Sequence, residues 1–192
     1  FFLLVPLFSV HFVDGLGWSA ATVGFVLAVR QVTQQGLGPL SGMLSDRFGI
    51  KPLICAGLLG RAVGFALTAN AGSVAHLTLA AMIAAIGGGL FEAPKAAAVA
   101  EFAGDQDRSR FYAMVNTVGA IGMAVGMQVG VILLHISFAA ASLVATACFV
   151  VAFLITLIWL PSPEAQTVKP VGASGLIEAF RDRTFRAYTM VL

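Results

Sequence analysis

Four ionisable side chains lie inside long apolar stretches of this sequence: Arg30, Arg61, Glu92 and Lys95. Glu92 and Lys95 are three residues apart, so a helix would place both side chains on one face. A carboxylate in an apolar cavity binds a proton more tightly than in water, and a neighbouring cation weakens that binding. Glu92 is therefore interpreted as a proton-binding or cation-attracting group, with Lys95 or Arg30 setting its affinity. The alternative is a structural ion pair that steadies the helix beside Pro94.

Three glutamines lie close to Arg30 in the sequence. Gln34 lies one turn after it, and Gln31 and Gln35 follow on an adjacent stripe. Such groups are hard to place against lipid, so we expect them to face a water-filled cavity or, alternatively, to hydrogen-bond between helices. Asn116 is a further candidate for a cavity. The candidate residues for a substrate or proton pathway are therefore Arg30, Gln34, Glu92, Lys95 and Asn116.

The elements that must position these groups are membrane helices. The chain of 192 residues is 59% hydrophobic and 10% charged, whereas soluble domains average about 25% charged residues. Several runs exceed the roughly 18 uncharged residues that span a bilayer. Helices are expected there because lipid offers the backbone no hydrogen-bond partners. The composition indicates an all-α membrane protein in a lipid bilayer, and the net charge of +2 indicates no nucleic-acid partner.

Six hydrophobic segments are predicted as helices: 1–13, 19–41, 52–70, 74–100, 111–134 and 137–160. They define a six-helix transmembrane bundle over residues 1–160 with a shortened first helix. Residues 161–186 are expected to form a cytoplasmic loop with a short interfacial helix, and residues 187–192 to begin a seventh helix. Both ends have the character of cuts in a longer chain.

Glycine spacing predicts where these helices pack closely. Gly60 and Gly64 recur at four-residue spacing, as do Gly122, Gly126 and Gly130, and such spacing brings membrane helices together. The run Gly87-Gly88-Gly89 lowers helix stability. It therefore predicts a tight crossing or a bending point.

Basic residues predict the orientation in the membrane. Lys and Arg occur in the second and fourth connections and in the tail, whereas the first, third and fifth connections contain none. Cytoplasmic loops carry the excess of such residues. The second and fourth connections and the tail are therefore expected to face the cytoplasm.

The sequence gives no sign of catalytic or metal chemistry. The three histidines are scattered, and Cys55 and Cys148 lack metal-ligand spacing. We therefore expect no catalytic residue, no metal site and no cofactor. A membrane-embedded enzyme is disfavoured for the same reason.

The connection between the second and third predicted helices reads Gly-Met-Leu-Ser-Asp-Arg-Phe-Gly-Ile-Lys-Pro, residues Gly42 to Pro52. It resembles the motif Gly-x-Leu-Ala-Asp-Arg-x-Gly-Arg-Lys of the major facilitator superfamily, although Ile50 replaces a common basic residue. The loop from Glu101 to Arg110 is similar to the acidic end of the fourth helix and the basic start of the fifth in that family. The resemblance covers the whole chain. It implies the six-helix amino-terminal half of a twelve-helix transporter.

The resemblance also implies a cytoplasmic gate. In this family the acid and base of the motif latch the two halves together in the outward-open state. The residues implied in this gating motif are Gly42, Asp46, Arg47, Gly49, Lys51, Glu101 and Arg108. Glu101 is the expected partner of Arg47. Because the family fold places its third helix outside the bundle, Arg61 is expected to have a structural role.

A closer similarity is to bacterial multidrug transporters, and it rests on Phe12-Val13-Asp14, on residues 34–38, and on Gly87-Gly88 with Pro94. It implies a monomeric secondary active transporter of the bacterial inner membrane. The implied activity is proton-coupled efflux of a lipophilic drug, a small-molecule substrate, by alternating access.

Two patterns of drug–proton antiporters are missing, however. Alanines occupy positions 81, 84 and 85, where such proteins often carry an arginine, and Met127 follows Gly126 where they have proline. A facilitator-type importer of a sugar or organic acid therefore remains the alternative. A membrane receptor without transport is a third possibility.

Overall fold

The computed structural model describes the backbone of residues 9–160, and their side chains except at positions 9, 104–108 and 134. The elements in this range are all helices: the π-helix η1 (Ser9–Gly15), α2 (Ala20–Gly36), α3 (Gly38–Phe48), α4 (Ile50–Thr68), α5 (Val74–Leu134) and α6 (Phe138–Trp159). The predictions made for residues 161–192 lie outside the described residues. The described range confirms the all-α prediction.

Serine side chains begin three of these helices. Ser19, Ser73 and Ser137 each accept a hydrogen bond from the backbone N–H three residues further on, at 3.0, 3.2 and 3.0 Å. Such caps satisfy backbone donors that the first turn of a helix leaves unpaired. The predicted helix starts at 19, 74 and 137 are confirmed to within one residue.

The prediction of one uninterrupted helix over residues 19–41 is wrong. The chain breaks at Leu37, where α2 ends and α3 begins. Pro39 lies in the first turn of α3. It has no backbone N–H to donate to the preceding turn, so α2 cannot continue through it.

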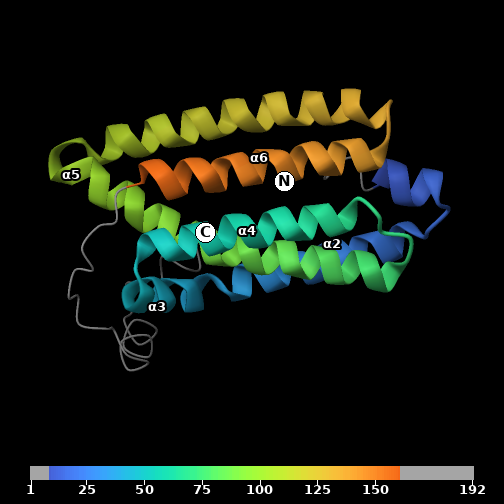
Figure 1. Ribbon diagram of the computed structural model, residues 1–192, viewed down its shortest axis with the longest axis horizontal. Coiled ribbons are helices and arrows are strands. Elements are labelled where there is room, and N and C mark those ends of the chain that lie inside the picture. Colours follow the sequence, from blue (N-terminus) through green and yellow to red (C-terminus); the bar gives the residue numbers. More distant parts are fainter. Residues whose placement is uncertain (1–8, 161–192) are drawn as a thin grey trace, which may run out of the picture.

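The two polar connections are more helical than predicted. Residues 42–48 belong to α3, and Gly49 alone separates α3 from α4 with φ of 90° and ψ of 160°. Only glycine adopts such a conformation readily. Residues 101–110, predicted as a loop, remain helical although α5 reverses direction there (Figure 1). That segment contains no proline to stop the helix.

Within residues 9–160, four helical segments are long and apolar enough to cross a membrane. They are Ile50–Thr68, Val74–Ala103, Ser109–Leu133 and Phe138–Trp159. We refer to Val74–Ala103 and Ser109–Leu133 as the first and second spans of α5. Figure 1 shows α4 beside the first span of α5, with α6 between α4 and the second span.

Two clusters of buried apolar residues hold the bundle together. One contains Phe12, Phe65 and Phe138 from three elements, and the other centres on Ile54 and Leu58 of α4. Phe149 of α6 packs against both clusters and stacks on Phe65 with ring centres 5.3 Å apart. This packing fixes an aromatic ring beside the charged residues of α4 and α5.

Candidate functional site

The candidate site is built on a close crossing of α4 and the first span of α5. A methyl group placed on Gly87 would lie 2.6 Å from the carbonyl oxygen of Gly57 and 2.5 Å from the backbone nitrogen of Arg61. One placed on Gly64 would lie 2.6 Å from the Cβ of Ala84. Side chains cannot occupy such spaces, so the backbones themselves are in contact. The prediction of a tight crossing at Gly87–Gly89 is confirmed.

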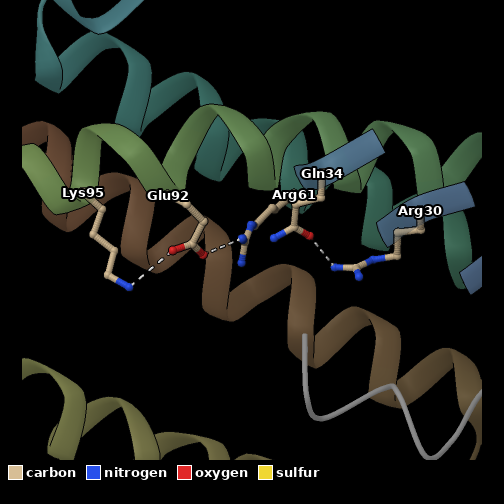
Figure 2. Close-up of polar contacts among 5 residues, drawn as sticks. All are labelled: Arg30, Gln34, Arg61, Glu92 and Lys95. Carbon is tan, nitrogen blue, oxygen red and sulfur yellow. Dashed lines mark hydrogen bonds and ion pairs between the residues drawn. The ribbon is translucent and has the colours of Figure 1, made fainter. Parts of the chain in front are cut away.

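This crossing brings Arg61 of α4 onto Glu92 of α5. The guanidinium Nη2 donates to Oε1 of Glu92 at 3.1 Å, while Nζ of Lys95 lies 3.6 Å from Oε2 (Figure 2). Each carboxylate oxygen therefore faces a different cation. The Arg61 side chain is 12% exposed, whereas those of Glu92 and Lys95 are 50% and 44% exposed. We call these three residues the charge network.

Aromatic rings hold the cations of the charge network. The guanidinium carbon of Arg61 lies 5.3 Å from the ring centre of Phe91 and 5.7 Å from that of Phe149. The Lys95 ammonium lies 5.6 Å from the Phe91 ring. Cations over ring faces are attracted by the ring quadrupole. Arg61 thus joins α4, α5 and α6, because Phe149 belongs to α6.

Arg61 is the residue that the sequence-based interpretation of this site lacked. Lys95 or Arg30 was predicted to act on Glu92: Lys95 does contact it, whereas the second cation on the carboxylate is Arg61 and not Arg30. In the sequence, the role of Arg61 is indicated by its position beside Gly60 in an apolar run. This indication becomes specific only when Gly87 is known to lie against the backbone of Arg61.

Arg30 and Gln34 form a separate polar pair on α2. Nη2 of Arg30 donates to Oε1 of Gln34 at 2.9 Å, and Arg30 is 5% exposed. Gly88 separates this pair from the charge network: a methyl group placed there would lie 2.9 Å from Cδ of Gln34 and 3.0 Å from Nη2 of Arg61. Figure 2 shows Gln34 beside Arg61. The glycine therefore allows two arginine-containing pairs to approach each other.

A cavity of about 570 Å³ lies next to the charge network, between the two spans of α5 and α6. Its walls combine one cation and one amide with apolar and small side chains, including Lys95, Asn116, Gly122, Met123, Cys148 and Phe149. Two residues predicted for a substrate pathway, Lys95 and Asn116, therefore line the same space. Such a volume lies within the range typical of small-molecule sites.

The charged interior carries an excess of positive charge. Two cations, Arg61 and Lys95, contact the carboxylate of Glu92, and a third, Arg30, belongs to the neighbouring pair with Gln34. Within the described part of the chain, no group of three His, Cys, Asp or Glu side chains could hold a metal ion.

The residues of the predicted gating motif lie around the α3–α4 corner and in α5. Gly42, Asp46 and Arg47 are in α3, Gly49 is the break, Lys51 begins α4, Glu101 is in α5, and the side chain of Arg108 lies outside the described set. The expected ion pair of Arg47 with Glu101 is absent from the described residues. Both side chains are exposed, and the Arg47 guanidinium lies 5.5 Å from the ring of Phe48. Hydrated surface charges gain little from pairing, so nothing holds these two together.

The fold is a bundle of apolar helices with charged residues between them, and sequence comparison places it in a family. Residues 1–192 match the profile of the Major Facilitator Superfamily, so the chain belongs to that superfamily and is a multi-pass membrane protein. Two curated relatives are the multidrug resistance proteins MdtH of Yersinia pestis (strain Pestoides F) and Yersinia pseudotuberculosis (serotype O:1b, strain IP 31758). Each is 40% identical over all 192 residues, which correspond to 48% of the relative. The chain spans about half the length of the curated relatives it matches, namely their amino-terminal half.

Proposed function

We propose that this chain supplies the amino-terminal bundle of a secondary active transporter that exports lipophilic drug-like molecules across the bacterial inner membrane. The superfamily match and the similarity to MdtH support transport and drug efflux. The observation that carries proton coupling is the half-exposed carboxylate of Glu92, held between two cations on two apolar helices. Ionisable groups at membrane depth are costly and usually serve transport.

Protonation of Glu92 would change the contacts between α4 and α5. The ionised carboxylate attracts Arg61 and Lys95, and the neutral acid attracts them much less. Proton binding would therefore loosen the charge network without disturbing the glycine crossing beside it. Such a change can bias the rocking of two helical halves about a central site, which is how alternating access works.

A flux assay tests this proposal. The full-length protein is reconstituted into proteoliposomes, a pH gradient is imposed, and movement of an uncharged lipophilic fluorescent dye such as Nile red is followed. The proposal expects gradient-driven dye movement that falls at least about tenfold in Glu92→Gln, since the neutral amide cannot exchange a proton. Asp14→Asn removes a carboxylate from an exposed position of η1, outside the charge network and the gating motif, and serves as the control. Dye movement in Glu92→Gln equal to that of the unsubstituted protein would sink proton coupling through this residue.

A second candidate is an importer of an organic acid. It is favoured by the two cations that contact the one carboxylate of Glu92, with Arg30 close by, because a negatively charged substrate would balance the excess positive charge. In the same vesicles, uptake of a radiolabelled organic acid with no dye movement would favour this candidate over drug efflux.

The gating residues and the orientation are part of the same proposal. We assign the α3–α4 corner, with Asp46 and Arg47, to the cytoplasmic side. A cysteine introduced at Asp46 should react with an impermeant maleimide only in inverted membrane vesicles. Labelling in intact spheroplasts would reverse the orientation.

A further inference from the structure

We propose that the cavity beside Lys95 binds an amphipathic organic anion, with the carboxylate or sulfonate group at Lys95 and the apolar body against Met123 and Phe149. This inference rests on the proposed transport function and names the chemical class that the site would take. A lipophilic cation of the same size would be excluded from it.

Charge is the first argument. Lys95 is the one charged side chain that lines the cavity, and it is 44% exposed, so its ammonium is accessible from the cavity side. The Glu92 carboxylate is one neighbour of the Lys95 ammonium, at 3.6 Å. Because an ammonium has three hydrogen-bond donors, it can contact Glu92 and a ligand together. Hydrogen bonds between an ammonium and a carboxylate are stronger than those between neutral groups.

The shape and lining of the cavity are the second argument. The amide of Asn116 adds a hydrogen-bond donor, while Met123 and Phe149 provide apolar walls. A small-molecule site typically combines such walls with a few polar groups that orient the ligand. About 570 Å³ is sufficient for a fused aromatic body with one charged substituent.

The charge network adds a linkage that a non-specific apolar cavity would not have. Lys95 is shared between Glu92 and the cavity, because it contacts the Glu92 carboxylate and also lines the open space. Without the negative charge of Glu92, Lys95 would be available to pair with a bound anion. The repulsion between the Glu92 carboxylate and that anion would also disappear. Anion affinity should therefore rise when Glu92 is neutral, whereas the affinity of a cation attracted by Glu92 would fall.

Two matched probes test the inference: pyrenylbutyrate and pyrenylbutyl-trimethylammonium share one apolar body and carry opposite charges. Equilibrium binding to the full-length protein is measured by fluorescence in phosphatidylcholine nanodiscs, with empty nanodiscs subtracted. The anion should bind saturably and the cation should not. Lys95→Gln should weaken anion binding at least about tenfold, which corresponds to roughly 1.4 kcal/mol, and Glu92→Gln should strengthen it severalfold.

Two further variants keep the result interpretable. Arg110→Gln removes one exposed positive charge from α5 outside the cavity lining and should leave anion binding unchanged. Gly122→Leu fills the cavity while leaving Lys95 in place; a methyl group there meets no other atom within 4 Å, so the helix should tolerate the change. It should abolish anion binding. Equal binding of both probes, or anion binding that survives Lys95→Gln and Gly122→Leu, would overturn the inference.

An anionic lipid headgroup shares the chemistry of the proposed ligand. Nanodiscs that contain phosphatidylglycerol distinguish the two sources. Unchanged anion affinity in those nanodiscs supports a small organic anion, and displacement of the probe by the lipid would refute it. Binding and flux are measured separately, so loss of anion selectivity with intact flux rejects this inference alone, and loss of flux with intact binding rejects the proposed function alone.

Discussion

The two spans of α5 use small residues in opposite ways. In an 18-residue apolar window of the first span 44% of residues are buried, and Gly87 contacts the backbone of α4. In the corresponding window of the second span 6% are buried, and a methyl group placed on Gly119, Gly122 or Gly126 would meet nothing within 4 Å. Regular spacing of small residues therefore permits close packing but does not compel it. A second helix must arrive with a complementary groove.

The difference also separates two kinds of chemistry. The packed side encloses the charge network, whose distances are set by contact between backbones. The open side borders the cavity, where space is available for a ligand. Lys95 and Phe149 belong to both sides, since each contacts the network and lines the cavity. Any coupling between proton and ligand would pass through these two residues.

The difference between the two spans of α5 is tested by adding one methyl group to a glycine of each span. Gly87→Ala should destabilise the protein by about 3 kcal/mol or more, because the new methyl would meet backbone atoms that cannot move aside. Gly119→Ala should be neutral or stabilising by up to about 1 kcal/mol, since alanine favours helix over glycine. Thermal unfolding of the purified full-length variants in detergent checks both. Equal losses in the two variants would show that the second span is packed as tightly as the first.

Removal of Arg61 should have the next largest effect. Arg61→Gln leaves Glu92 with Lys95 alone and removes two cation–ring contacts. We expect a loss of about 1–3 kcal/mol, below the cost for a fully buried pair because Glu92 is half exposed. Arg61→Lys should recover only part of it, because lysine lacks the planar group that stacks on rings. Unfolding temperatures, with Arg110→Gln as the unaffected control, provide the measurement.

A double-mutant cycle compares the strengths of the two ion pairs of Glu92 in the charge network. The coupling of Arg61 to Glu92 should reach about 1 kcal/mol or more, because the arginine is largely buried and the pair is hydrogen-bonded. The coupling of Lys95 to Glu92 should be below about 0.5 kcal/mol, as for other half-exposed pairs within one helix. Unfolding of the single and double glutamine variants yields both values. A larger coupling for Lys95 would contradict the assignment of Arg61 as the principal partner.

The smallest effect is expected at a buried serine of the packed side. Ser142 is fully buried, and its hydroxyl has no hydrogen-bond partner among the residues that the structure describes. Ser142→Ala should therefore be neutral or stabilising by up to about 1 kcal/mol. Thr68→Val is the contrast, because the Thr68 hydroxyl donates to the carbonyl of Gly64 at 2.8 Å and its loss should destabilise the protein. Unfolding temperatures that fall equally in both variants would indicate a partner for Ser142.

Much of the fold could be predicted from local features. Long apolar runs between polar turns predict the spans, and serine caps mark three helix starts, since both act over a few residues. The break at Leu37 could also have been predicted, because Pro39 and two flanking glycines disfavour a helix there. The helical course of residues 101–110 could not, because nothing in that segment distinguishes a helical reversal from an ordinary loop.

For the candidate site, the residue types were evident from the sequence but their partners were not. The sequence by itself determined that Glu92, Lys95, Arg30 and Arg61 lie within apolar helices, because charge and hydropathy are properties of the chain. Only the tertiary structure decided that Glu92 contacts Arg61 and not Arg30, and that Lys95 and Asn116 line one cavity. Such pairings depend on the rotation of each helix about its axis. That rotation is set where glycines let two backbones approach, which is a property of both helices together.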